Sequence, residues 1–179
     1  MLMIGIINEL NLLTSASDAS LLSFFLCQRT DAQLNNATAV LRGLIYQLII
    51  QQPNLISYLK AEYEHAGKRL FEDSNAFHAL AGIFQNMLQD SKLIVAYLVV
   101  DALDECETGL PRLLGLITHL ASAPPTQVKS IVSSGERLDI EQNLGLDDTG
   151  MRLSLEVNAK LVSRAISTYI DYKVSQLAP

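Results

Sequence analysis

The sequence of 179 residues lacks several features that define common classes of protein. It contains no Gly-x-x-x-x-Gly-Lys-Ser/Thr stretch, the loop whose backbone cradles phosphates in many nucleotide-binding proteins. Cys27 and Cys106 are its only cysteines. They are too few for a disulfide framework or a zinc site, so we interpret them as small apolar side chains in a reducing compartment. The three histidines lie in separate segments without metal-ligand spacing, and no Ser/His/Asp or Cys/His arrangement can be argued.

Charge and long apolar runs are also scarce. Charged residues make up 18% of the chain, the net charge is -6, and the thirteen lysines and arginines are scattered. A nucleic-acid surface needs a concentrated basic patch, so nucleic acid is excluded as a partner. No apolar run approaches the ~20 residues of a membrane span. The apolar start at residues 1–7 lacks the basic flank of a signal peptide. We therefore expect a cytoplasmic protein without membrane association.

What the sequence does contain is a hydrophobic fraction of 49%, enough for the core of one domain. Apolar residues at helical spacing alternate along the chain with short strand-like runs. This order predicts an α/β fold with a mainly parallel sheet covered by helices on both faces. The pattern predicts strands over 20–28, 93–100, 128–134 and 151–157, and helices over 2–13, 37–52, 54–66, 75–89, 109–122 and 158–178. A loop with a short helix is expected over 136–150. The pair Asn35-Asn36 is expected to supply the cap of the helix at 37–52, and Asn158 the cap of the final helix.

Three acids follow the apolar strand predicted at 93–100, namely Asp101, Asp104 and Glu105. Ligands of open α/β sheets bind beyond the carboxyl ends of the strands. Acids at that place can hold a hydrated magnesium ion or polarise a water for attack on a phosphate. The alternative is a solvated acidic turn that caps the following helix, because acids often follow strands. The spacing alone leaves both interpretations open.

The strand predicted at 128–134 ends in Ser133 and Ser134, followed by Gly135 and, two residues later, Arg137. A polar residue at the tip of a strand beside the acidic strand is suited to contact a phosphate. Arg137 offers a positive charge for the same anion, and its alternative is an exposed arginine in a turn. These three side chains are therefore candidate cofactor-binding residues.

With these residues laid out, the sequence resembles the NACHT-type P-loop NTPases of fungal NOD-like receptors. These belong to the signal-transducing ATPases with numerous domains and are similar to the nephrocystin-like N-terminal module. The resemblance covers nearly the whole chain. It rests on MLMIGIINEL at 1–10, FFLCQ at 24–28, AVLRGLIYQL at 39–48, HAGK at 65–68, LFED at 70–73, YLVVDALDEC at 97–106, IVSS at 131–134 and LSLE at 153–156.

The resemblance implies magnesium with ATP (or GTP) as cofactors, nucleotide-gated oligomerisation and a role in signalling. It implies that Asp101 is the magnesium aspartate, the Walker B residue. Asp104 and Glu105 match further catalytic acids, with Glu105 the better candidate to polarise water. Ser133 and Ser134 match the end of the sensor strand.

Two departures from the family pattern shape the expected function. The family places its first strand and glycine-rich loop immediately before Met1, and it usually has an arginine where this sequence has Gly135. We therefore expect a single incomplete domain over 1–179, with a core at 1–157 and a carboxyl-terminal helix at 158–178. The absent strand would be central, and the chain by itself would neither bind nor hydrolyse ATP. The alternative is a non-catalytic scaffold or decoy that self-associates or pairs with intact relatives.

Overall fold

A computed structural model of the chain describes residues 2–16, 19–73, 75–90, 92–122, 128–144 and 159–177. Its sheet has three parallel strands in the order β1 (Ser20–Leu26), β2 (Val95–Asp101) and β3 (Val128–Val132). The register aligns Leu26 with Asp101, and Val100 with Val132, so the strands end at one common edge. We call this the carboxyl edge. The predicted strand at 151–157 and the predicted cap Asn158 lie outside the described residues.

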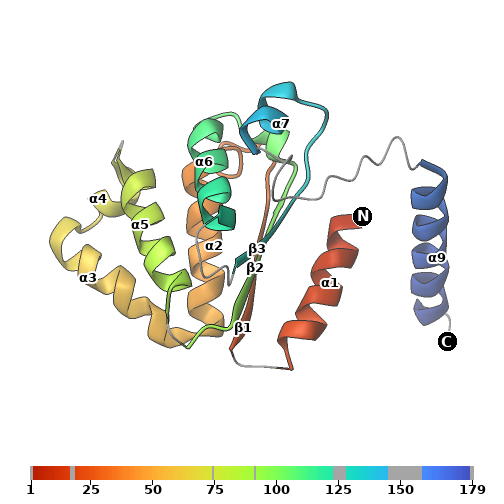
Figure 1. Cartoon of the computed structure of the whole chain (residues 1–179), viewed down its shortest axis with the longest axis horizontal. Coiled ribbons are helices and arrows are strands. Elements are labelled where there is room, and N and C mark those ends of the chain that lie inside the picture. Colours follow the sequence, from red (N-terminus) through yellow and green to blue (C-terminus); the bar gives the residue numbers. More distant parts are fainter. Residues whose placement is uncertain are drawn as a thin grey trace.

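Helices cover both faces of the sheet, which confirms the predicted α/β fold (Figure 1). On one face lie α2 (Ala37–Gln51), α5 (Ala76–Leu88) and α6 (Leu110–Ser122), and on the other lies α1 (Leu2–Thr14). The alternation of β2 explains this layering, because successive side chains of a strand point to opposite faces. Leu98 and Val100 belong to the larger core under α2, α5 and α6, whereas Val99 belongs to the smaller core under α1.

Shorter elements connect these layers. They are η1 (Pro53–Leu55), α3 (Ile56–Ala66), α4 (Arg69–Glu72), η2 (Leu103–Glu105) and α7 (Leu138–Leu144), the short helix expected in 136–150. The predicted cap of α2 is confirmed, since the side chain of Asn36 accepts a hydrogen bond from the Ala39 N–H at 2.8 Å. The last described helix is α9 (Ala159–Leu177). No helix in the described ranges combines the length and hydropathy needed to cross a membrane.

Helix α1 runs antiparallel to the strands (Figure 1). It is tied to the sheet by Met3 and Leu10, which are buried against Leu22 and Val99. The carboxyl end of α1 lies near the start of β1, so the amino end of the helix lies toward the carboxyl edge of the sheet. A helix amino end carries unpaired N–H groups and a partial positive charge.

The outer edge of β1 is closed by two glutamine side chains of α2. Gln51 accepts from the Leu22 N–H at 3.1 Å and donates to the Leu22 carbonyl at 2.6 Å. Gln47 accepts from the Phe24 N–H at 3.0 Å and donates to the Phe24 carbonyl at 2.7 Å. Each side-chain amide thus takes the place of a peptide group in a neighbouring strand. We call these two residues the glutamine edge cap.

Candidate functional site

Asp101 is the last residue of β2 and pairs its backbone with Leu26 of β1. Its Oδ1 accepts a hydrogen bond from the hydroxyl of Ser133, which directly follows β3. The same hydroxyl oxygen accepts from the Ala102 N–H at 3.0 Å, and the Ser133 N–H donates to the Val100 carbonyl at 3.0 Å. Two predicted site residues, Asp101 and Ser133, are therefore brought together at the carboxyl edge by the ends of adjacent strands.

Asp104 lies in η2 and holds a different partner. Its Oδ1 accepts from the Gly135 N–H at 2.8 Å, which joins the acidic loop to the loop after β3. A Cβ at position 135 would lie 3.2 Å from Asp104 Oδ2, so glycine permits this approach. An arginine here, as in the resembled family, would force the carboxylate to move. The glycine at position 135, which departs from the family pattern, is therefore in direct contact with Asp104.

Glu105 faces the loop after β1. Its Oε2 accepts from the Arg29 N–H at 2.9 Å, and the guanidinium of Arg29 donates to the Asp104 carbonyl at 3.0 Å. A more distant contact of 3.9 Å joins Arg29 Nε to Glu107. Arg29 therefore holds η2 from one side through both its backbone and its side chain. The three predicted acids meet three separate partners rather than one another.

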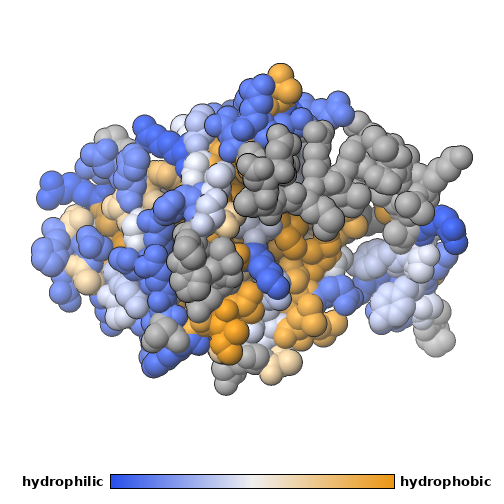
Figure 2. Space-filling model, in the orientation of Figure 1, coloured by the Kyte–Doolittle hydropathy of each residue, from blue (hydrophilic) through white to orange (hydrophobic). Residues whose placement is uncertain are grey.

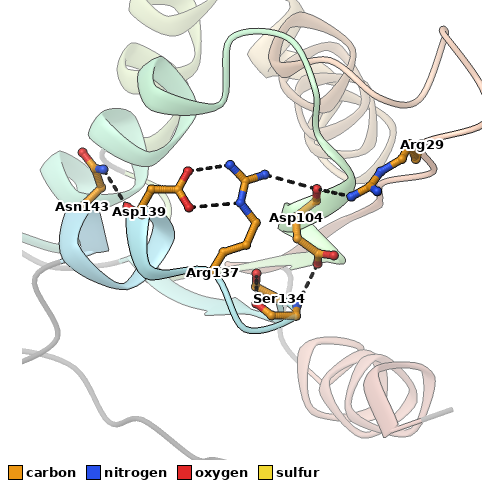
Figure 3. A network of polar contacts seen from close by, with 7 residues as sticks. Arg29, Asp104, Ser134, Arg137, Asp139 and Asn143 are labelled. Atoms are coloured by element: carbon orange, nitrogen blue, oxygen red, sulfur yellow. Dashed lines mark hydrogen bonds and ion pairs between the residues drawn. The ribbon is translucent and has the colours of Figure 1, made fainter.

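Arg137 approaches η2 from the opposite side (Figure 3). Its Nη1 donates to the Asp104 carbonyl at 3.4 Å, and its Nε donates to Asp139 at 3.0 Å. The bidentate pair with Asp139 raises the pKa of Arg137 and lowers the pKa of the Asp139 carboxyl. Ser134, by contrast, donates its hydroxyl to the neighbouring Gly135 carbonyl at 2.7 Å. Arg137 and Ser134 thus lie beside the acidic loop, both engaged with protein groups.

The backbone of the acidic loop is strained at Ala102, which follows Asp101. Its φ of 54° places it in the left-handed region, where a Cβ is unfavourable. This conformation turns the chain sharply from β2 into η2. Leu103 is fully buried, and its N–H donates to the Ser133 carbonyl at 2.9 Å, so the turn is anchored on both sides. Strained residues concentrate at ligand sites, and this one lies next to the candidate metal residue.

Within the described residues, no three His, Cys, Asp or Glu side chains gather closely enough to form an all-protein metal site. Magnesium does not require one, because it usually takes one or two carboxylates and completes its shell with water and phosphate oxygens. Asp101, oriented by Ser133 at the tip of a central strand, fits that one-carboxylate arrangement. The donor set therefore fits magnesium brought together with a phosphate-bearing ligand.

A cleft of about 390 Å³ opens beside η2. Five charged side chains, two apolar side chains and Cys106 line it. It is lined by Arg29, Asp104, Cys106, Glu107, Leu110, Pro111, Arg137 and Asp139. Neither Arg29 nor Asp139 is among the candidate residues predicted from the sequence. Arg29 could have been found, because it follows a predicted strand at the edge where Asp101 stands.

The family described as Nephrocystin 3, N-terminal, matches residues 1–135. The chain is also similar to the vegetative incompatibility protein HET-E-1 of Podospora anserina, with 50% identity over 179 residues. The match covers 100% of this chain and 13% of that protein, so the chain spans about an eighth of the relative's length. No solved structure matches the chain.

Proposed function

The chain belongs to the nephrocystin 3 N-terminal family, and from that premise we propose that it is part of a NACHT-type nucleotide-binding domain. In this proposal the domain serves a fungal signalling NTPase that switches its oligomeric state with the bound nucleotide. The likeness to a vegetative incompatibility protein supports a signalling role in a larger protein. The observation that supports this proposal most strongly is the hydrogen-bonded pair of Asp101 and Ser133 at the carboxyl edge of a parallel sheet.

The surroundings of this pair suit a phosphate group. The amino end of α1 lies toward the same edge, where its unpaired N–H groups favour an anion (Figure 1). Ser133 orients Asp101 from the neighbouring strand, so the carboxylate is fixed before any ligand arrives. We propose that Asp101 holds magnesium and that Ser133 and Ser134 face the terminal phosphate. Bound magnesium would neutralise phosphate charge as the terminal phosphate is transferred.

The remaining predicted residues take supporting places around the phosphate. We propose that Glu105 polarises the attacking water while the Arg29 N–H fixes its carboxylate. Asp104 connects η2 to Gly135 and so holds the acidic loop against the loop after β3. Arg137 keeps the carbonyl of Asp104 in place from the other side. The cofactors in this proposal are magnesium with ATP or GTP.

These 179 residues contain no glycine-rich phosphate loop, whose N–H groups and lysine supply most of the grip on a triphosphate. We therefore propose that the chain by itself binds ATP weakly and does not hydrolyse it. Isothermal titration of the chain with MgATP tests this directly. Heat signals that fit a submillimolar dissociation constant would overturn it.

The family function itself is tested by reading the DNA immediately upstream of the codon for Met1. An in-frame Gly-x-x-x-x-Gly-Lys-Ser/Thr sequence is expected there, and the extended protein should bind MgATP at micromolar concentrations in the same titration. The matched control is the same extended protein with its loop lysine replaced by alanine, which should bind weakly. An extended protein that carries the loop and still fails to bind contradicts the proposal.

A second candidate function, a scaffold that pairs with intact relatives, is favoured by the edges of the sheet. The glutamine edge cap closes β1, whereas β3 pairs only with β2 among the described residues. Helix α1 also exposes Leu12 and Leu13, and Figure 2 shows hydrophobic residues over this part of the surface. Co-purification with a tagged full-length relative tests it. Recovery of the chain in a monomeric form, with no relative bound, opposes it.

A further inference from the structure

Cys27 and Cys106 lie together beneath the acidic loop, although 79 positions separate them in the sequence. Cys27 directly follows β1, and its N–H donates to the Asp101 carbonyl at 3.0 Å. Cys106 directly follows η2, and its N–H donates to the Leu103 carbonyl at 3.1 Å. Both thiols are buried and reduced in the same core cluster, and each shifts the pKa of the other; the Cys106 thiol donates a hydrogen bond to the Thr108 carbonyl at 3.7 Å. The parallel pairing of β1 with β2 is what places them side by side.

The two thiols have different chemical environments. Proximity to Cys27 lowers the pKa of Cys106, and the charge of Arg137 lowers it further against the opposing effect of burial. The same proximity raises the pKa of Cys27, assisted by burial and by the charges of Glu105 and Asp101. Cys106 lines the cleft of about 390 Å³, whereas Cys27 is not among the residues that line it. A small reagent in the cleft therefore meets Cys106 before Cys27.

We propose that hydrogen peroxide converts Cys27 and Cys106 into a reversible intramolecular disulfide that fastens the acidic loop to the end of β1. This inference stands apart from the proposed nucleotide function. It rests on the adjacency of two thiols on different loops, on the cleft that reaches one of them, and on the absence of any other cysteine in the sequence.

The reaction has two steps, both within known thiol chemistry. The Cys106 thiol first loses its proton to solvent, and the thiolate attacks one oxygen of hydrogen peroxide. The O–O bond breaks, and the departing hydroxide takes a proton from solvent to form water. The product is a sulfenic acid on Cys106. The Cys27 sulfur then attacks the Cys106 sulfur, and the S–OH bond breaks. The leaving hydroxide takes the Cys27 proton, so a second water forms and both sulfurs are oxidised while peroxide is reduced.

The disulfide would act on the candidate site because its two ends adjoin it. Cys106 is the residue after Glu105, and Cys27 is bonded through its N–H to the Asp101 carbonyl. The sulfurs of two reduced, non-bonded thiols must draw closer to reach the bond length of about 2.05 Å. The residues after β1 and after η2 therefore move toward one another on oxidation. The redox state would thus be coupled to the position of the acidic loop.

The test treats the purified chain with hydrogen peroxide in the presence of dimedone, which traps sulfenic acids, and reads intact mass and linked peptides. In native buffer we expect a monomer that has lost two hydrogen atoms, with Cys27 linked to Cys106. In concentrated urea the distant thiols rarely meet, so the dimedone adduct should predominate. The Cys27→Ala variant should give the dimedone adduct on Cys106 in native buffer, and Cys106→Ala should leave Cys27 unmodified.

Dithiothreitol should restore the reduced mass of the native product. The proposal is overturned by any of three results with the native chain: both cysteines remain reduced, dimedone captures Cys106 as efficiently as in urea, or only intermolecular disulfides form. If Cys27→Ala does not fold, Cys27→Ser takes its place. Circular dichroism of each variant identifies those that have kept the native fold.

Discussion

The glutamine edge cap yields the sharpest prediction about stability and association. Replacing Gln47 by alanine removes two hydrogen bonds to β1, at 3.0 and 2.7 Å, and leaves the N–H and carbonyl of Phe24 without these partners. Gln47 is half-buried, so water replaces the lost bonds only in part, whereas Gln51 is exposed. Gln47→Ala should therefore destabilise the chain more than Gln51→Ala.

The expected size follows from the number of bonds. A neutral hydrogen bond contributes about 1 kcal/mol net, so two bonds to Phe24 contribute about 2 kcal/mol. Alanine returns about 0.4 kcal/mol through its higher helix propensity. The net loss in the free energy of unfolding should be roughly 1.5 kcal/mol for Gln47→Ala and less for Gln51→Ala. In the double variant Gln47→Ala/Gln51→Ala the edge of β1 is open, and this edge should also promote self-association.

Urea denaturation followed by circular dichroism measures the stability, and sedimentation velocity measures the association. Gln85→Ala is the matched control, because Gln85 is a half-buried glutamine of helix α5. It should change the free energy of unfolding by less than about 0.5 kcal/mol. If the double variant unfolds like Gln85→Ala and remains monomeric, the edge cap has no energetic role and the reasoning fails.

Three further predictions concern the acidic loop. Gly135→Ala places a Cβ 3.2 Å from Asp104 Oδ2 and should lower the free energy of unfolding in urea by about 1 kcal/mol, so an unchanged midpoint would count against this contact. Ala102→Gly removes the Cβ that is unfavourable at a φ of 54° and should raise the urea midpoint, with a net gain in the free energy of unfolding below about 1 kcal/mol. A lower midpoint would refute strain at this residue. Arg137→Gln should raise the pKa of the Asp139 carboxyl toward its ordinary value in an NMR titration. Because pairing with Arg137 lowers the pKa of Asp139 in the folded state, the ion pair stabilises the fold at neutral pH, and this stabilisation is lost as the pH falls through the pKa of the folded state. Arg137→Gln should abolish this dependence of stability on pH.

Much of the fold was predictable because its pattern is local. Helical spacing indicated α1, α2, α5 and α6, and apolar runs indicated three strands whose parallel pairing the structure confirms. The boundaries shifted by a few residues, and β2 extends to Asp101 where the prediction ended one residue earlier. Asp101, expected at the carboxyl tip of this strand, is its last residue and pairs its backbone with Leu26.

The partners within the site were less predictable, because they depend on long-range contacts. The acids at 101, 104 and 105 follow one predicted strand, and in the structure they bind Ser133, Gly135 and Arg29 respectively. Spacing along one loop does not encode which neighbouring loop each carboxylate meets. Glutamines four positions apart on α2 were likewise visible in the sequence, but their role requires knowing that β1 lies at the sheet edge.

In the proposed function Asp101 holds magnesium and Glu105 polarises the attacking water, so the most direct measurement separates binding from hydrolysis in the extended protein. Asp101→Asn should weaken magnesium-dependent ATP binding at least about tenfold, whereas Glu105→Gln should keep binding and lose most of the phosphate release. Asp171→Asn, an exposed change on α9, serves as the control and should alter neither quantity. Magnesium-dependent binding that survives Asp101→Asn would contradict the central claim.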